Sequence, residues 1–184
     1  MDPDTLDAID LKLLVLLQSD ARMSNVQLAK AVNLSPSPCL ARVRALEQRG
    51  FISGYVTLLD AQRLGLQVSV FIQVRLERQI ETALETFERA MVARPEVMEC
   101  YLMTGSADYL LRVVVADLAA LQDFIVNVLS RVQGVGNIQS SIALKQVKYQ
   151  TALPLAALPG RAGARAPEGR ASAVRRGRRA AFPR

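Results

Sequence analysis

One predicted helix carries small, polar and basic side chains of the kind that contact nucleic acids. At about 100° per residue, every third or fourth residue of segment 36–49 lies on the same side of a helix. The candidate contact residues on and beside one side are Ser35, Ser37, Pro38, Ala41, Arg42, Arg44 and Gln48. Small residues let a helix backbone approach the floor of the DNA major groove, and arginine can bond guanine edges or phosphate. The alternative is an ordinary solvated face with two arginines.

The first residues of this helix add a second reason to consider DNA. Ser35 and Ser37 stand at its N-terminus, where free backbone N–H groups and the helix dipole favour a phosphate. Ser35 is also a suitable N-cap, and Pro36 suits the first helical position. We therefore expect a phosphate contact at this end of the helix.

The turn Thr104-Gly105-Ser106-Ala107-Asp108-Tyr109 is a second candidate site. By residue type it has two interpretations. It is either a hairpin loop, in which Gly105 supplies an unusual backbone angle and Asp108 closes an Asx-turn, or a site for a small zwitterion. In the second case Gly105 exposes backbone groups, and the Asp108 carboxylate pairs with an ammonium group.

Several kinds of chemistry are disfavoured by the composition. The chain has no histidine, the commonest general base and metal ligand, and its two cysteines, Cys39 and Cys100, are too far apart to form a zinc cluster alone. We therefore expect no metal, no cofactor and no enzymatic activity. No apolar run approaches the roughly 18 residues of a membrane span, and the acidic N-terminus does not resemble a signal peptide. These features predict a cytoplasmic protein without a membrane partner.

The first 50 residues are predicted to form three helices. Apolar residues from Leu6 to Leu17 recur at helical spacing after Asp4 or Thr5, either of which can cap the helix. Ser24-Asn25-Val26-Gln27 has the form of a capping box and predicts a short second helix that ends near Asn33, a residue tolerant of left-handed backbone. The third helix should run to Arg49, before Gly50. Its predicted inward side consists of Cys39, Leu40, Val43 and Leu46.

A different periodicity begins at Gln67. Residues 51–60 are expected to form a short strand pair and 61–66 a linker, after which apolar and polar residues alternate as in a strand. The predicted elements are a strand at 67–76, a helix at 80–91, strands at 97–103 and 109–115, a helix at 118–132 and a strand at 138–147. The order β-α-β-β-α-β is that of a ferredoxin-like fold. The three predicted helices and the strand pair at 51–60 together indicate a winged helix-turn-helix. The predicted fold class is therefore α+β, with this unit followed by a ferredoxin-like domain.

The charge of the chain is concentrated at its C-terminus. Residues 151–184 carry eight arginines and one glutamate, so they supply more than the whole net charge of +6. From about Leu153 the chain is rich in Ala, Arg, Pro and Gly, and we expect this segment to be disordered. It either adds phosphate contacts of low sequence specificity, is an inert extension, or reflects an error in the assigned stop codon.

Two stretches of the sequence resemble a known family. LDAIDLKLLVLLQSDARMSNVQLAKAVNLSPSPCLARVRALEQRGFISGY resembles the DNA-binding domain of the Lrp/AsnC (leucine-responsive regulatory protein) family, with LSPSPCLARVRALE as the most specific part. PEVMECYLMTGSADYLLRVVV through NIQSSIALKQVKY resembles the amino-acid-sensing domain of that family. The resemblance covers about residues 4–153 and is strongest to the branched-chain keto-acid dehydrogenase regulators of pseudomonads.

The resemblance implies a transcription regulator that binds double-stranded DNA and forms dimers through its sensing domains, assembled into tetramers or octamers. The implied organisation is a DNA-binding domain at 1–60, a linker at 61–66, a sensing and oligomerisation domain at 67–152 and a tail at 153–184. Many relatives have charged residues at the positions of Ala41 and Ala45, so the preferred operator sequence is expected to differ from theirs.

The resemblance also implies an amino-acid site near the turn, at contacts between dimers. The matching residues are Thr104, Gly105, Asp108 and Tyr109, and Met103 and Ser140, expected on neighbouring strands, could complete it. We expect an apolar effector such as leucine, isoleucine or valine, and control of branched-chain amino-acid metabolism. The alternatives are a regulator of proline catabolism, an architectural DNA-binding protein without a ligand, and an enzyme of amino-acid metabolism.

Overall fold

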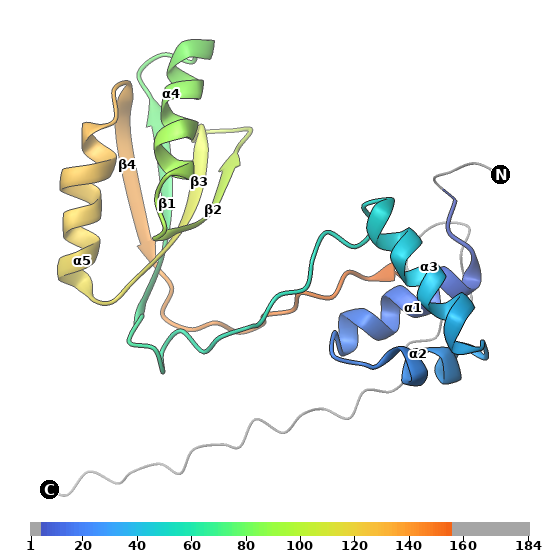
Figure 1. Ribbon diagram of the computed structural model, residues 1–184. Helices are drawn as coiled ribbons and strands as arrows, with labels where there is room; N and C mark the ends of the chain where they lie inside the picture. Colours follow the sequence, from blue (N-terminus) through green and yellow to red (C-terminus); the bar gives the residue numbers. More distant parts are fainter. Residues whose placement is uncertain (1–4, 156–184) are drawn as a thin grey trace, which may run out of the picture. The chain divides into compact units, whose positions relative to one another are not determined.

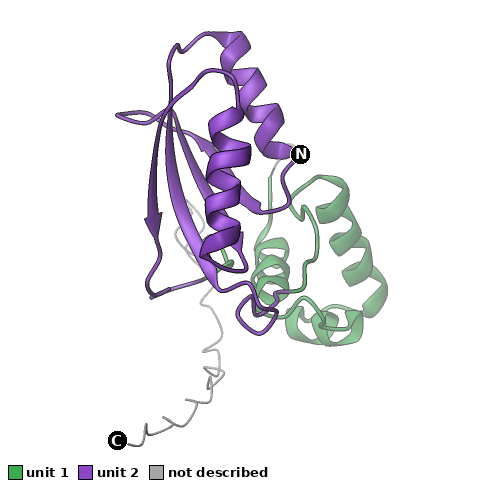
Figure 2. Ribbon diagram, turned by 90° about the vertical axis from the view of Figure 1, so that its left-hand side faces the viewer, with its two compact units in different colours: residues 1–57, 150–184 green, residues 58–149 purple. Residues whose placement is uncertain are grey.

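The computed structural model describes residues 5–155, which form two compact units (Figure 1). One unit runs to Thr57 and includes the segment that starts at Gln150, and the other spans Leu58–Tyr149 (Figure 2). Segment 150–155 therefore joins the N-terminal unit, whereas the sequence interpretation had kept residues up to 152 in the C-terminal domain. The tail was predicted to be disordered from residue 153, but Leu153 and Leu155 contact the N-terminal unit. The rest of the predicted tail lies outside the described residues.

The N-terminal unit is built from three helices: α1 (Ala8–Ser19), α2 (Asn25–Val32) and α3 (Pro36–Gln48). They enclose one apolar core, in which Leu13, Cys39 and Leu46 are fully buried. Leu155 packs against the same core, and the Leu153 N–H donates to Gln18 Oε1 at 2.6 Å. The end of the described chain is thus part of the helical unit.

The helix boundaries follow local hydrogen bonding. Ser24 and Gln27 form the predicted capping box, with the Gln27 N–H donating to Ser24 Oγ at 3.3 Å, and Asn33 adopts the predicted left-handed conformation with φ of 57°. The start of α1 differs from the prediction, because its N-cap is Asp7 rather than Asp4 or Thr5. Asp7 is favoured because Asp10 stands three residues later and completes a second capping box.

Two further predictions for the first 60 residues were wrong. Residues 51–60 form no strand pair, and nearly all of them are exposed, so a two-stranded ribbon would have little to pack against. Tyr55 instead donates a hydrogen bond to Glu47 Oε1 at 2.8 Å. Leu40, expected on the inward side of α3, is 38% exposed because it lies at the margin of the buried stripe.

The C-terminal unit has the predicted β-α-β-β-α-β order. Its elements are β1 (Val68–Leu76), α4 (Glu81–Val92), β2 (Val97–Leu102), β3 (Tyr109–Val115), α5 (Leu118–Asp123) and β4 (Val135–Ile142). The helical path of α5 continues through a π-helical turn (Phe124–Val128) and a 3-10 turn (Leu129–Arg131). The antiparallel sheet has the strand order β2-β3-β1-β4, as in a ferredoxin-like fold.

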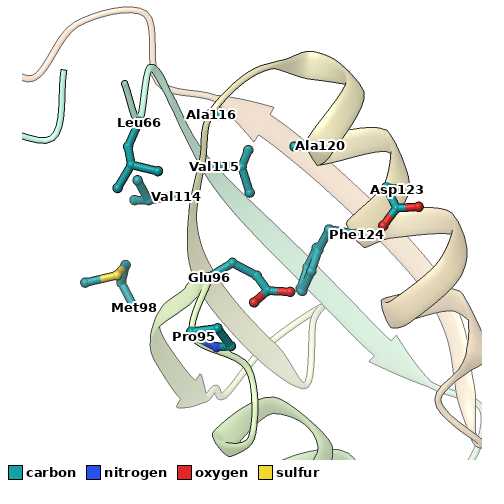
Figure 3. A pocket seen from close by; sticks show the side chains of 10 residues that line it. All are labelled: Leu66, Pro95, Glu96, Met98, Val114, Val115, Ala116, Ala120, Asp123 and Phe124. Atoms are coloured by element: carbon teal, nitrogen blue, oxygen red, sulfur yellow. The ribbon is translucent and has the colours of Figure 1, made fainter. Parts of the chain in front are cut away.

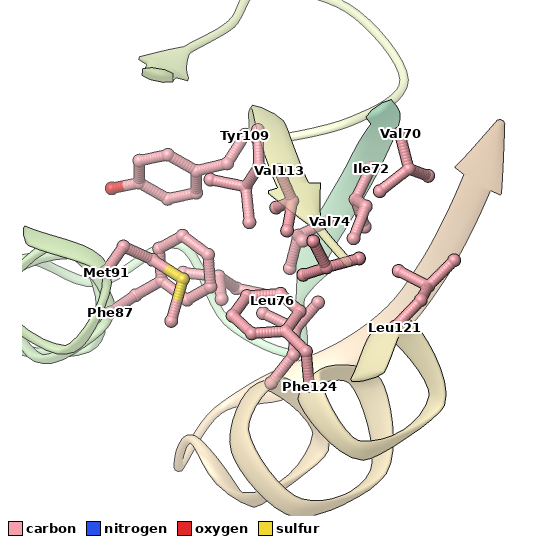
Figure 4. Close-up of a cluster of buried hydrophobic side chains, with 13 residues drawn as sticks. Val70, Ile72, Val74, Leu76, Phe87, Met91, Tyr109, Val113, Leu121 and Phe124 are labelled. Atoms are coloured by element: carbon pink, nitrogen blue, oxygen red, sulfur yellow. The ribbon is translucent and has the colours of Figure 1, made fainter. Parts of the chain in front are cut away.

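The helices cover one face of this sheet. Alternate residues of β1 and β3 point into a core that Phe87 and Met91 of α4 and Phe124 complete (Figure 4). The opposite face carries exposed Phe71 on β1 and Tyr101 on β2. The sheet therefore presents a second, partly apolar face that no element of the unit covers.

The last strand lies earlier in the sequence than predicted. Gly134, with φ of 92°, turns the chain directly into β4, which starts at Val135 instead of Ile138. The strand ends at Ile142, which pairs with Val70 near the start of β1, so there is almost no partner strand left for the predicted continuation to 147. Within residues 5–155, no helix is long and apolar enough to cross a membrane.

Candidate nucleic-acid interface and effector turn

The outer face of α3 contains most of the predicted DNA-contact residues. Cys39, Val43 and Leu46 anchor the inner side of the helix in the core. The exposed residues on or beside the opposite side are Ser35, Ser37, Pro38, Ala41, Arg44 and Gln48. Within the described part of the chain Arg44 forms no ion pair, so its guanidinium is available to a partner. This face combines small side chains with one available cation.

The N-terminus of α3 provides fewer donors than the sequence interpretation assumed. Pro36 and Pro38 have no N–H, so Ser37 provides the only backbone donor among the first three residues of the helix. The Ser35 side chain, expected to cap the helix, makes no capping hydrogen bond. A phosphate here would be bound by the Ser37 N–H, the serine hydroxyls and the helix dipole. Asn25 Nδ2 donates to the Pro36 carbonyl at 2.8 Å and ties the starts of α2 and α3 together.

Arg42 differs from the other predicted contact residues. Its Nη1 atom donates to Asp7 Oδ2 at 2.6 Å and to Asp10 Oδ1 at 2.8 Å, and only 35% of its side chain is exposed. Burial opposes ionisation of Asp7, but hydrogen bonds from the Asp10 N–H and Arg42 outweigh it and lower the pKa of Asp7. The hydrogen bonds that Arg42 donates to Asp7 and, next, to Asp10 raise the pKa of Arg42. The structure thus places Arg42 against α1, whereas the sequence predicted a DNA contact.

The predicted effector turn is a tight connection between β2 and β3. The Met103 N–H donates to the Asp108 carbonyl at 2.8 Å and closes the loop, while Met103, Thr104 and Gly105 are exposed. Gly105 has φ of 119°, a backbone conformation that residues with a Cβ rarely adopt, although a Cβ at this position would meet no other atom within 4 Å. The tip of the turn is therefore accessible to a ligand.

Asp108 does not occupy the position that an ammonium partner requires. Its side chain is buried, Oδ2 accepts a hydrogen bond from the Leu76 N–H at 2.7 Å, and Oδ1 accepts one from Gln79 Nε2. The Asp108 N–H also donates to the Val74 carbonyl at 2.9 Å. The carboxylate therefore closes neither an Asx-turn nor an open ligand site; it holds the end of β1 to the turn.

Tyr109 is also a structural residue. Only 1% of it is exposed, its ring centroid lies 4.5 Å from that of Phe87, and its hydroxyl donates to Glu88 Oε1 at 2.7 Å. Burial and, next, the Glu88 carboxylate raise the pKa of Tyr109. The side chain faces the core, so it does not reach a ligand on the surface of the turn.

Ser140 lies away from the turn within one chain. The sequence interpretation placed Met103 and Ser140 on neighbouring strands, but β2 and β4 are the two edges of the sheet, with β3 and β1 between them. Ser140 pairs with Ile72 of β1. The expected adjacency was wrong because the returning strand β4 adds to the far side of β1.

Two hollows lie on the C-terminal unit. The first, of about 420 Å³, has apolar walls that include Phe124 and Val115, and its charged residues are Glu96 and Asp123 (Figure 3). Because none of its lining residues is basic, it offers no partner for the carboxylate of an amino acid.

The second hollow has both charges of a zwitterion site. It measures about 370 Å³ and is lined by Glu77, Arg78, Ile80 and Gln133, among other residues. It flanks Gln79, whose side chain binds Asp108 beside the turn. Its residues could not be grouped from the sequence, because they come from the loop after β1, from α4 and from the segment before β4, which only the fold brings together.

Family models match both parts of the chain. Residues 6–53 match a winged helix-turn-helix DNA-binding model, and residues 69–153 match the Lrp/AsnC ligand-binding domain. The chain is 50% identical over 150 residues to the Bkd operon transcriptional regulator of Pseudomonas aeruginosa, covering 82% of this chain and 98% of that protein. It is 40% identical over 148 residues to the leucine-responsive regulatory protein of Escherichia coli K12, covering 80% and 90%.

Solved structures agree with this assignment. A transcriptional regulator of Neisseria meningitidis in complex with L-Met is 40% identical, with a TM-score of 0.79, over 82% of this chain and 97% of that one. An AsnC family regulator of Agrobacterium tumefaciens is 38% identical, with a TM-score of 0.77 over 82% and 97%. The exposed helix, the ferredoxin-like unit and these relatives agree: the chain belongs to the Lrp/AsnC family of DNA-binding transcription regulators.

Proposed function

We propose that this regulator reads its operator with the outer face of α3. Ser37, Ala41 and Gln48 lie toward the major groove, and Arg44 bonds a guanine edge or a phosphate. The observation that carries this proposal is the exposed α3 face, on which Arg44 has no acidic partner in the described structure. Ser35 and Pro38 border the same surface at the start of the helix.

A gel shift on the DNA upstream of its own gene tests this assignment. Arg44→Ala is expected to weaken operator binding by about tenfold or more, because one bidentate base contact is worth about 1–3 kcal/mol. Arg63→Ala removes the same charge from an exposed side chain in the C-terminal unit and should change binding little. Equal affinities for wild type and Arg44→Ala would refute the assignment.

We infer that the effector is an apolar amino acid bound at the tip of the turn. Met103, Thr104 and Gly105 provide the exposed surface of the turn. The hollow lined by Glu77 and Arg78 is the alternative location, because it offers a carboxylate for an ammonium group and a guanidinium for a carboxylate. Asp108 and Tyr109 contribute by holding the turn in place. Ser140 could join this site only from another subunit.

Branched-chain amino acids are the first candidates, with control of branched-chain catabolism as the role. The 50% sequence identity to a Bkd operon regulator supports this choice, and the L-Met complex of the Neisseria relative supports an apolar ligand. Calorimetry with leucine, isoleucine, valine, methionine and proline tests it. Binding of proline alone would favour the alternative role in proline catabolism, and binding of none would favour an architectural DNA-binding protein.

We further propose a homodimer, assembled into tetramers or octamers, that acts in the cytoplasm on the nucleoid and has no enzymatic activity. Support for the dimer comes from the uncovered sheet face, where Phe71 and Tyr101 are 40% and 51% exposed. Light scattering should detect at least a dimer, and Phe71→Asp should shift it toward monomer. Sustained turnover of an amino acid by the purified protein would contradict the absence of enzymatic activity.

A further inference from the structure

We propose that Arg42 is a positioning residue that sets the rotation of the DNA-reading helix, and that it does not itself bind DNA. Its side chain joins the middle of α3 to the first turn of α1 through Asp7 and Asp10. This inference rests on the proposed DNA-binding role of α3. It assigns the task of contacting DNA to Arg44, two residues away on the helix.

The three side chains form a closed hydrogen-bond network. Asp7 Oδ1 accepts from the Asp10 N–H at 2.8 Å, and Asp10 Oδ2 accepts from the Asp7 N–H at 3.2 Å, which completes the capping box of α1. The remaining oxygen of each carboxylate accepts from Arg42 Nη1. All four carboxylate oxygens therefore have a donor, and two of them would lose their donor within the chain if Arg42 turned outward.

This network can fix the rotation of α3 about its own axis, because it bonds a side chain of α3 to the start of α1. Apolar contacts such as those of Cys39 and Leu46 hold the helix against the core, but they are not directional and permit some rotation about the helix axis. A guanidinium bonded to two carboxylates on another helix fixes a direction as well as a distance. Because Ala41 is adjacent to Arg42 and Arg44 follows it closely, this anchor also fixes the direction in which the reading face points.

The positioning role and a direct DNA contact predict opposite signs for removal of the acids. If Arg42 bound phosphate, neutralising Asp10 would release the cation and remove a negative charge near DNA, so affinity would rise. If Arg42 positions α3, neutralising Asp10 weakens the anchor, so specific affinity falls. Salt dependence also separates the two roles. Each lost phosphate contact reduces the magnitude of the negative slope of log Kobs against log[salt] by about 0.9.

The test uses the full-length chain with Arg42→Ala, Arg42→Lys, Asp10→Asn and the double variant Arg42→Ala/Asp10→Asn. Asparagine keeps an oxygen for the capping box, so Asp10→Asn is expected to fold even where Arg42→Ala does not, and circular dichroism checks each variant. Affinity for the DNA upstream of the gene and for a random duplex is measured by anisotropy over a range of salt concentrations.

We expect Arg42→Ala and Asp10→Asn each to weaken specific binding by about tenfold, with the double variant no weaker than either alone. Arg42→Lys should restore part of the affinity, and the salt slope should match that of wild type. A slope reduced by about one contact in Arg42→Ala, together with tighter binding by Asp10→Asn, would overturn the proposal. A wild-type chain that binds neither duplex would instead refute the DNA-binding role of α3, which Arg44→Ala tests separately.

Discussion

Replacing Asp108 by alanine should lower the stability of the ferredoxin-like unit, because the carboxylate has a structural role. Asp108 is 5% exposed, and its carboxylate accepts a hydrogen bond from the Leu76 N–H at 2.7 Å, at the end of β1. Alanine would leave that buried N–H without an acceptor. An unsatisfied buried donor costs about 1–3 kcal/mol, so we expect the free energy of unfolding to fall by about that amount. The bond from Gln79, an exposed residue, should add little.

Asp108→Asn is the matched variant, because its amide oxygen can still accept from Leu76. A neutral acceptor forms a weaker bond than a carboxylate, so a loss of about 1 kcal/mol is expected. Glu85→Ala, which removes an exposed carboxylate from α4, should cost less than about 0.5 kcal/mol.

Urea unfolding at a fixed protomer concentration measures these differences, since the stability of an oligomer depends on concentration. Amide hydrogen exchange at Leu76 gives a local measurement of the same bond. Wild-type stability and unchanged Leu76 protection in Asp108→Ala would refute the structural role. If that variant were stable but no longer bound the effector, Asp108 would be the ammonium partner that the sequence suggested.

Three other predictions concern the N-terminal unit and the tail. Asn33→Ala should lower the stability by about 1 kcal/mol because residue 33 has φ of 57°, whereas Asn33→Gly should not; equal melting temperatures would contradict this. The folded-state pKa of Asp7 is below its ordinary value of 3.8, so the ionised carboxylate stabilises the fold fully above that pH and loses this effect as the pH falls further. The melting temperatures of wild type and Asp7→Asn should therefore converge in acid, and a constant difference would refute the linkage. A chain ending at Leu155 lacks the eight tail arginines but keeps its core contact, so binding to a random duplex should show a flatter salt dependence; an unchanged slope would indicate an inert tail.

Elements with strong periodicity or local capping could be predicted from the sequence. The alternation from Val68 to Leu76 indicates a strand with one buried face, and the Ser24/Gln27 capping box marks the start of α2. The third helix followed from Pro36 at its first position and from apolar residues at helical spacing. The β-α-β-β-α-β order then identified the ferredoxin-like fold.

The candidate site was harder to predict because its side chains respond to tertiary contacts. Arg42 and Arg44 are equivalent by residue type, yet only Arg42 meets two aspartates, 35 and 32 residues away in the sequence. Asp108 was predicted to bind an ammonium group, but its carboxylate points toward the backbone of β1, where it accepts the Leu76 N–H. The supposed adjacency of Met103 and Ser140 failed because strand order is not a local property of the chain.

The proposed regulator both binds an operator and responds to an apolar amino acid. The most direct test is a gel shift on the DNA upstream of its own gene, with and without each amino acid of a full panel. We expect a shifted band, and we expect the DNA affinity of the protein or the mobility of the band to change with leucine, isoleucine, valine or another apolar amino acid. A shift that no amino acid alters would contradict the effector response, and the absence of any shift would contradict the DNA-binding role.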